Sequence, residues 1–415
     1  MQKRIMVLFV FSLLFLVMDY YIFQAVVLVS KDWPAVWKGL FRYGFWVPSA
    51  LCFLAMLWWA FGDPYAHSSS FRNWIVTGIF TIYISKLFAV LFLFADDIQR
   101  GVRYLASLFS RNGPAGLPGE PIPRSEFLSR AALMAATVPF SAFTYGIISG
   151  AHDYRVKRVA ISLPNLPKVF DGLTIGQVSD IHSGSFFNKT AVKGGVEMLL
   201  KEKPDMVFFT GDLVNNQTTE VKGYIDVFNK VKAPLGVFSV TGNHDYGDYH
   251  RWESAHAKAQ NFQDLIRVHH ELGFDLLQNE HRWVEVDGER IAVIGNENWG
   301  AGRFSKYGKL DQAYRGAEAP VKLLLSHDPS HWDAQVRPYY KDIDIMFSGH
   351  THGFQFGVEV GGFRWSPSQY IYKQWAGLYK EEGQYLYVNR GFGYLGYPGR
   401  VGIPPEITIV TLKSA

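Results

Sequence analysis

The sequence predicts a two-part chain, in which about four transmembrane helices over residues 1–150 precede an α/β domain over residues 151–415. Three observations lead to this fold class. Apolar residues are densest before residue 150, short apolar segments alternate with segments of helical spacing after it, and polar motifs directly follow the short segments. The first part is therefore expected to lie in a membrane and the second to fold in water.

The membrane part is predicted from four long apolar stretches. A helix that crosses a bilayer needs about 20 mostly apolar residues, and residues 5–29, 43–61, 74–95 and 131–149 meet this requirement. Pro139 and several small polar residues dilute the fourth stretch, which could instead be the apolar core of a signal-type segment. The Pro- and Gly-rich residues 111–124 are predicted to form a linker before it.

Lys and Arg residues near the ends of the spans predict the orientation of the chain in the membrane. Seven lie between spans one and two or between spans three and four, and six lie on the opposite side. This small excess places the N-terminus and the C-terminal domain outside the cytoplasm. Residues 124–128 resemble a twin-arginine export motif in which Ser125 replaces the second arginine, and this favours the same orientation.

Two charged residues, Asp19 and Lys86, fall near the middle of the first and third predicted spans. An isolated charge at that depth costs at least about 2.5 to 3.5 kcal/mol. The two spans run in the same direction and each charge lies slightly past the middle of its span, so we expect the side chains to pair. The pair could be structural and fix helix packing, or it could belong to a proton or ion path.

Composition excludes several classes of function. The net charge is only +4 and the basic residues form no long run, so a nucleic acid is not expected as a partner. The single cysteine, Cys52, lies within an apolar stretch. An intrachain disulfide and a cysteine metal cluster are therefore impossible.

The second part reads as short strands separated by helical segments. Helices are expected between the first three strands and over residues 249–272. In α/β folds the loops after the carboxyl ends of the strands carry the functional site. The predicted strands cover residues 173–178, 206–210, 237–240, 283–286, 290–294, 322–325, 343–347, 384–388 and 407–412.

Carboxylate, imidazole and amide side chains stand directly after several of these strands. A site with these ligands and no thiolate favours Mn, Fe or Zn. If the strand ends are extended, side chains two residues apart point to the same side, so Asp180 with His182, and His350 with His352, could each share one cavity. The motifs are Asp180-Ile181-His182, Gly211-Asp212, Gly242-Asn243-His244-Asp245, Ser326-His327-Asp328 and Gly349-His350-Thr351-His352.

This ordered set of five motifs resembles the calcineurin-like metallophosphoesterase superfamily over about residues 171–414. The resemblance implies a two-sheet β-sandwich flanked by helices and two divalent metal ions. It assigns Asp180, His182 and His352 to one ion. It assigns Asn243, His327 and His350 to the other, with Asp212 bridging both. His244 would be the catalytic residue that donates a hydrogen bond or proton to the phosphate or the leaving oxygen.

Details of the motifs point to one branch of the superfamily. The protein serine/threonine phosphatases carry a further Asp and Arg after the second motif, and residues 211–217 of this chain lack both. Residues 349–355 and 389–406 instead resemble bacterial membrane-associated enzymes of the phosphodiesterase branch. We therefore expect an integral protein of a bacterial cell membrane with an extracytoplasmic catalytic domain.

Other polar residues leave alternatives open. Arg390 and Arg400 flank a Gly-rich stretch and could clamp a phosphate or simply lie in a packed loop. Residues 298–318 could form a lid or a long surface loop. Asp245 is expected to cap the following helix and Asp328 to form a turn, although each could instead orient the neighbouring His. The remaining candidates, which we expect to be surface or core-edge residues and not ligands, are His256, His269 and His270.

The function predicted from these features is metal-dependent hydrolysis of a phosphodiester or phosphomonoester by attack of a metal-bound hydroxide, at the membrane. The substrate could derive from a lipid or the cell envelope. A different class of function is a membrane transport or sensing protein with a non-catalytic phosphoesterase-like domain. A third is a pyrophosphohydrolase of lipid assembly on the cytoplasmic face.

Overall fold

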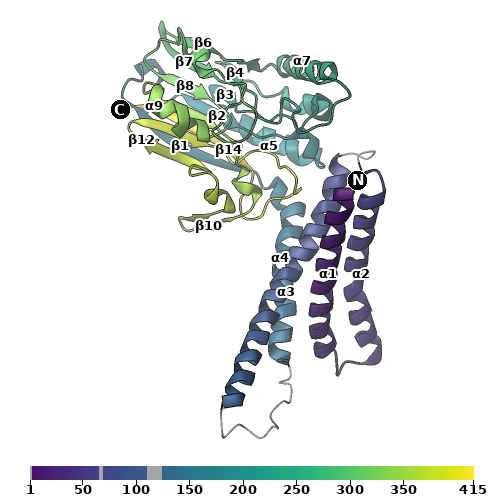
Figure 1. The fold of residues 1–415 in the computed structure, drawn as a ribbon. Helices are drawn as coiled ribbons and strands as arrows, with labels where there is room; N and C mark the ends of the chain where they lie inside the picture. The colour runs from purple at the N-terminus through teal and green to yellow at the C-terminus, as the bar shows by residue number, and fades with distance from the viewer. Residues whose placement is uncertain (1, 65–68, 110–123) are drawn as a thin grey trace. The chain divides into compact units, whose positions relative to one another are not determined.

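The computed structural model describes residues 2–64, 69–109 and 124–415. The chain divides into two compact units, Met1–Tyr145 and Gly146–Ala415 (Figure 1). The predicted linker falls almost entirely on residues 110–123, outside the described residues. Each unit is described by itself below.

The first unit contains four long helices, and each matches one of the predicted membrane spans. The helix α2 begins at Ala35, eight residues before the predicted span, directly after Pro34. The helix α3 has 41 residues, which at about 1.5 Å per residue exceeds the thickness of a bilayer. The bounds are α1 Gln2–Val29, α2 Ala35–Phe61, α3 Ser69–Phe109 and α4 Glu126–Ile148.

The predicted pairing of Asp19 with Lys86 is confirmed. Lys86 Nζ lies 2.5 Å from Asp19 Oδ1 and also donates to Ser49 Oγ at 2.6 Å, while the Tyr83 hydroxyl donates to Asp19 Oδ2 at 2.9 Å. Both charged side chains are buried. The network ties α1, α2 and α3 together at a depth where an unpaired charge would be expensive.

The second unit contains two six-stranded sheets. The first has the order β1-β14-β2-β3-β4-β5 and the second β12-β13-β9-β8-β7-β6, with β10 and β11 as a separate hairpin. The strands are β1 Arg155–Leu163, β2 Thr174–Val178, β3 Met206–Phe209, β4 Val237–Ser239, β5 Asp275–Leu276, β6 Glu280–Val286, β7 Glu289–Gly295, β8 Lys322–Leu325, β9 Ile345–Ser348, β10 Val358–Val360, β11 Phe363–Trp365, β12 Gly377–Glu381, β13 Gln384–Val388 and β14 Glu406–Ser414.

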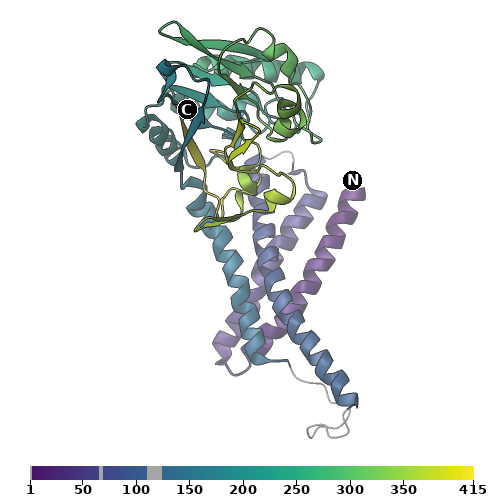
Figure 2. The same ribbon diagram turned by 90° about the vertical axis from the view of Figure 1, so that its left-hand side faces the viewer.

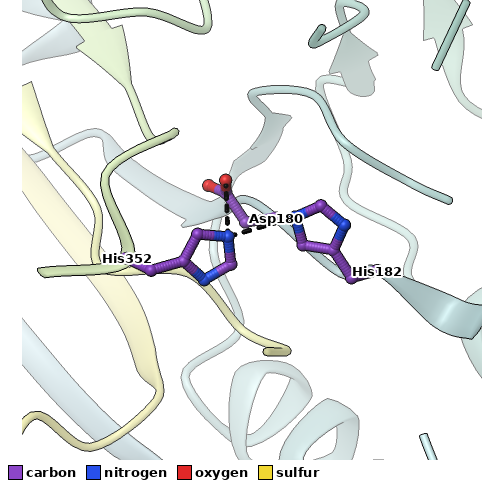
Figure 3. A group of neighbouring side chains, drawn as sticks. All are labelled: Asp180, His182 and His352. Atoms are coloured by element: carbon purple, nitrogen blue, oxygen red, sulfur yellow. Dashed lines mark hydrogen bonds and ion pairs between the residues drawn. The ribbon is translucent and has the colours of Figure 1, made fainter. Parts of the chain in front are cut away.

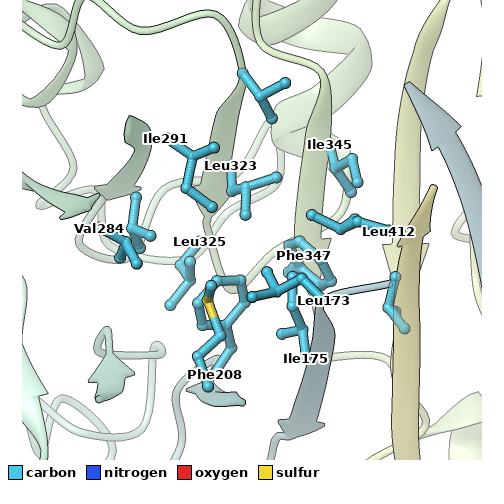
Figure 4. Close-up of a cluster of buried hydrophobic side chains, with 14 of the residues drawn as sticks. Leu173, Ile175, Phe208, Val284, Ile291, Leu323, Leu325, Ile345, Phe347 and Leu412 are labelled. Carbon is cyan, nitrogen blue, oxygen red and sulfur yellow. The ribbon is translucent and has the colours of Figure 1, made fainter. Parts of the chain in front are cut away.

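Apolar side chains from both sheets form one core between them, as Figure 4 shows. Ile175 and Phe208 come from the first sheet, and Leu323 and Phe347 from the second. The rings of Phe208 and Phe347 meet edge to face at 5.0 Å between centroids. This packing of two sheets face to face confirms the predicted sandwich.

Helices cover the outer faces of both sheets. On the first sheet, α5 (Lys189–Lys201), α6 (Ile225–Phe228) and α7 (Ala255–Leu272) bury apolar side chains against β2 and β3. Outside the second sheet, α8 (Leu310–Tyr314), Trp332 of a π-helical turn and Val336 complete a further core. Trp332 is fully buried.

The helix predicted over residues 249–272 begins at Ala255, where Ser254 caps it, and ends before Gly273 in the left-handed conformation. On this helix His269 is fully buried, whereas His256 and His270 are exposed. His269 shares a hydrogen bond with Ser239 Oγ at 3.0 Å. It is therefore a core residue.

The strand directions bring several carboxyl ends together. Strands β2, β3 and β4 are parallel in the first sheet, and β7, β8, β9 and β13 are parallel in the second. The loops after β2, β3, β4, β8 and β9 carry all five polar motifs. The fold thus gathers these motifs at one edge of the sandwich.

The buried Asp19–Lys86 pair leads to the first prediction. Asp19→Asn or Lys86→Met leaves one charge without its partner, so each single variant should lose about 3 to 5 kcal/mol of stability. The double variant should lose less than the sum of the two. Thermal unfolding of the full chain in nanodiscs measures this, with Asp32→Asn at an exposed position as the control. Strictly additive losses would show that the two side chains do not depend on each other.

Candidate metal centre

Six of the predicted metal ligands gather in two buried groups. Asp180, His182 and His352 form the first group, shown in Figure 3. Asp212, His327 and His350 form the second. Within each group the potential ligand atoms all lie within 4.8 Å of one another. Each group combines residues that follow strands of both sheets, so the sandwich has to form before either group exists.

In the first group three atoms converge on one point. His182 Nε2 lies 3.1 Å from His352 Nε2, and His352 Nε2 lies 3.2 Å from Asp180 Oδ1. Burial lowers the pKa of His182 to about 3. Burial alone would raise the pKa of Asp180, but His352 and His327 outweigh it and hold that pKa below its ordinary value. The group therefore combines a carboxylate with a neutral imidazole.

The second group is equally tight. His327 Nε2 lies 3.1 Å from Asp212 Oδ2 and 3.3 Å from His350 Nδ1. Burial would lower the pKa of His327, yet the carboxylates of Asp212 and Asp180 raise it to about 10. The same negative charge that attracts a proton to His327 attracts a metal cation.

The Asp212 carboxylate lies between the two groups. Its Oδ2 is 3.1 Å from His327 Nε2 in the second group and 3.5 Å from His182 Nε2 in the first. Its Oδ1 accepts a hydrogen bond from the His244 backbone N–H at 2.9 Å. One carboxylate oxygen thus faces both groups, while the other is held by the backbone.

The hydrogen bonds around the two groups fit metal binding. His327 Nδ1–H donates to the Thr210 carbonyl oxygen at 2.7 Å, which turns Nε2 toward the site. His350 Nε2 bonds with the Tyr372 hydroxyl at 2.8 Å, and its Nδ1 faces His327. In the described part of the chain, buried His182 Nδ1 and Asn243 Oδ1 have no hydrogen-bond partner. Asn243 Oδ1 is therefore free to act as a ligand.

The backbone of the motifs differs from the extended strand ends that the sequence suggested. Five of the seven predicted ligands have a positive φ, between 47° and 72°, which non-glycine residues seldom adopt. The expectation that the i, i+2 spacing acts through extended backbone is wrong for these pairs. Left-handed turns aim the side chains instead. The five residues are Asp180, His182, Asp212, His350 and His352.

Asp245 holds two of these turns together. Its carboxylate accepts hydrogen bonds from the backbone N–H groups of Gly242, Asp212, Leu213 and Val214, at 2.8 to 3.3 Å. The expectation that Asp245 caps the following helix is wrong, because α7 begins ten residues later and has its own cap. Asp245 instead fixes the loop after β3 to the loop after β4.

His244 is oriented by a group that the sequence did not reveal. Its Nδ1–H donates to the backbone carbonyl oxygen of Asn215 at 2.7 Å, while the Asn215 side chain bonds with Ser185. The ring is partly exposed and lies 5.0 Å from the His182 ring between centroids. His244 therefore presents Nε2 beside the two groups.

Comparison with known proteins agrees with this geometry. Residues 173–354 match the family model Calcineurin-like phosphoesterase, and residues 3–151 match Probable Calcineurin-like phosphoesterase, transmembrane domain. A Bacillus subtilis (strain 168) protein, Uncharacterized metallophosphoesterase YkuE, is 30% identical over 253 residues, which cover 60% of this chain and 82% of that protein. The chain belongs to the calcineurin-like phosphoesterase family.

One relative extends the similarity to the first unit, and another covers about two thirds of this chain. Transmembrane protein with metallophosphoesterase domain from Danio rerio is 28% identical over 363 residues, covering 85% of this chain and 76% of that protein. Uncharacterized metallophosphoesterase YkoQ from Bacillus subtilis (strain 168) is 28% identical over 289 residues, covering 66% of this chain and 97% of that protein. Together with the four candidate spans, the match of residues 3–151 to the transmembrane-domain model and the Danio rerio relative show a membrane protein of this family.

In this calcineurin-like phosphoesterase, the two arginines of the Gly-rich stretch are packed inside the domain. Arg390 pairs with Glu406, and both side chains are almost fully buried. Arg400 is also buried and donates to the carbonyl oxygens of Arg390, Gly391 and Gly393. Of the two alternatives, the structure shows the packed loop. Arg400 also contacts the ligand group, since its Nη2 lies 3.3 Å from His352 Nδ1.

Part of the segment 298–318 lies against the second group. The Phe304 ring meets the His350 ring edge to face at 4.9 Å between centroids, and Tyr307 stacks on Tyr246 at 3.6 Å. The segment therefore covers one side of the site and is not a detached surface loop. Asp328 forms the expected turn by accepting a hydrogen bond from the Ser330 backbone N–H at 2.8 Å.

Proposed function

We propose that this chain is a dinuclear-metal phosphoric ester hydrolase that acts on a phosphodiester or a phosphomonoester at a membrane. The observation that supports this most directly is the position of Asp212 Oδ2, within 3.5 Å of an imidazole nitrogen in each of the two groups. A carboxylate in that position can bridge two cations. Membership of the calcineurin-like phosphoesterase family supports the same reaction class.

In this proposal the two groups hold separate divalent ions. Asp180, His182 and His352 would hold one ion, and Asn243, His327 and His350 would hold the other, with Asp212 available to both. The oxygen and imidazole ligands favour Mn, Fe or Zn. Two such ions stabilise the negative charge of the phosphoryl group and make water acidic enough to act as a nucleophile near neutral pH.

The residues of the chain supply the rest of the reaction. His244 Nδ1–H is committed to the Asn215 carbonyl oxygen, so the ring offers Nε2 to the substrate. A protonated Nε2 can donate to a phosphoryl oxygen or to the leaving oxygen as the ester bond breaks. The backbone N–H of the same residue also holds Asp212 Oδ1. One residue, His244, therefore both offers a proton donor and holds the bridging carboxylate in place.

The proposal includes the location of the domain. Residues 1–150 would form the transmembrane domain and residues 151–415 the catalytic domain, extracytoplasmic and anchored in a bacterial cell membrane. The seven-to-six distribution of basic residues around the spans supports this orientation. A membrane anchor favours a substrate presented at a membrane, such as a lipid or cell-envelope phosphoester.

Loss of the bridging carboxylate should abolish activity. The full chain in detergent should release nitrophenol from mono- or bis-nitrophenyl phosphate when supplied with Mn, Fe or Zn, and a chelator should stop the release. Asp212→Asn removes the negative charge shared by the ions, so turnover and bound metal should both fall. Asp264→Asn, at a partly exposed position on α7, is the matched control. An unchanged rate in Asp212→Asn would refute the dinuclear proposal.

His244→Gln should separate catalysis from metal binding. A general acid contributes about 10²- to 10⁴-fold to a rate, so kcat should fall by that order while the metal content stays the same. The loss should be larger for an alkyl phosphate than for a nitrophenyl phosphate, because the poorer leaving group needs the proton more. His256→Gln, on the exposed face of α7, serves as the control. Equal losses for both leaving groups would argue against proton donation.

The orientation can be tested with reporters fused after Ala415. Alkaline phosphatase is active only outside the cytoplasm. Green fluorescent protein that is exported in unfolded form does not become fluorescent, so its fluorescence reports a cytoplasmic location. We expect activity from the first fusion and no fluorescence from the second. The reverse pattern would place the catalytic domain in the cytoplasm.

A further inference from the structure

In the hairpin β10–β11 the apolar side chains lie on the outer face and the charged side chains on the inner face. Its register pairs Val358 with Trp365, Glu359 with Arg364, and Val360 with Phe363. Residues that face each other directly, or lie two apart on one strand, share a face of a ribbon. Val358, Val360, Phe363 and Trp365 therefore form one face. Glu359 and Arg364 form the other.

The charged face turns toward the domain. Glu359 forms ion pairs with Lys157 at 3.3 Å and with the buried Arg390 at 3.4 Å. The Arg364 guanidinium lies over the Trp375 ring at 5.2 Å from its centroid. These contacts fix which side of the hairpin faces inward. The apolar face is left pointing away from the domain.

The apolar face is exposed to an extent unusual for a domain in water. The relative solvent exposure is 70% for Val360, 63% for Phe363 and 44% for Val358. The exposed apolar surface continues through Tyr370 at 76% and Ile371 at 68%. Trp365 Nε1 donates to the Tyr370 hydroxyl at 3.3 Å, which joins the two parts. Contiguous exposed apolar surface of this kind marks a site of protein or membrane contact.

The base of the hairpin is joined to the end of the last membrane span. That candidate span covers Glu126–His152, and its residues from Gly146 onward belong to the second unit. The Arg400 backbone N–H donates to the Gly146 carbonyl oxygen at 3.1 Å. Val401, the next residue, pairs with Phe356 at the base of the hairpin. Two short steps therefore connect the C-terminal part of the candidate span to the base of the hairpin.

We propose that the β10–β11 hairpin, with Tyr370 and Ile371, inserts its apolar face into the interfacial layer of the bilayer in which the chain is anchored. A lipid surface fits better than a protein partner for two reasons. The inner charges already have partners within the domain, and aromatic side chains with polar tips, such as Trp365 and Tyr370, favour the headgroup level of a membrane. The last candidate span ends within the same unit as the hairpin, so the hairpin is tethered to the membrane part of the chain.

This lipid contact is independent of the proposed hydrolysis, but it bears on the site. Tyr372 follows Ile371 directly and bonds with His350 of the second metal-ligand group. The membrane contact would therefore lie within a few residues of a side chain of the metal centre. Substrate that diffuses in the plane of the membrane would meet the site without leaving the interface.

Photocrosslinking on the full chain tests the lipid contact directly. Phe363 is replaced by p-benzoylphenylalanine, a photoreactive residue that inserts into nearby C–H bonds, and the protein is reconstituted in nanodiscs of phosphatidylcholine and phosphatidylglycerol. The matched control is the same replacement at Trp283, an aromatic residue of β6 that is 45% exposed. The β6–β7 and β10–β11 hairpins lie at opposite ends of the second unit (Figure 1 and Figure 2).

Several-fold more lipid adduct at position 363 than at position 283, detected by mass spectrometry, is the expected result. Adding Val360→Asp should lower the adduct yield at position 363 several-fold, because a charge on the apolar face opposes insertion. An equal yield at both positions, or an adduct at position 363 that joins two copies of the chain in place of lipid, would overturn the proposal.

Discussion

The site depends most on the carboxylate of Asp212, whose two oxygens have different partners. One oxygen is held by the backbone N–H of His244, and the other faces an imidazole nitrogen from each of two groups. Because His182 follows a strand of the first sheet and His327 a strand of the second, this contact can exist only in the assembled sandwich. The chemistry of the site is thus tied directly to the packing of the two sheets.

The backbone around Asp212 is strained, and buried polar contacts offset that strain. Left-handed φ values at non-glycine residues are costly, and five candidate ligands share them. Asp245 accepts four backbone hydrogen bonds from two loops, and Arg400 donates to three carbonyl oxygens behind His352. In the described structure both side chains bond mainly to main-chain atoms. Their hydrogen bonds stabilise the left-handed backbone conformation that these loops would otherwise disfavour.

Each of the two units pairs charged side chains with groups of the same unit. In the membrane unit, Asp19 and Lys86 satisfy each other with help from Ser49 and Tyr83. In the second unit, charges on the inner face of the β10–β11 hairpin are paired with the domain, and the apolar face turns outward. The proposed insertion into the bilayer interface would remove this apolar face from water.

The sequence by itself determined the four membrane helices, the strands of the buried interior and the types of side chain in the site. Long apolar runs and short apolar segments can be recognised from local composition. Strands β8 and β13 have the bounds that this pattern predicts. The grouping of the ligands came from the family resemblance, since spacing alone does not say which loops meet. Strands β1, β5, β10, β11 and β12 were missed because they are short, lie at edges or mix charged and apolar residues.

Only the tertiary structure decided how the side chains are held. The Asn215 carbonyl oxygen that orients His244, the Thr210 carbonyl oxygen behind His327 and the four N–H groups around Asp245 are main-chain atoms. Every residue carries such atoms, so residue type gives no signal of their use. The same holds for the left-handed turns of Asp180 and His350, which local preference disfavours and which contacts between distant segments impose.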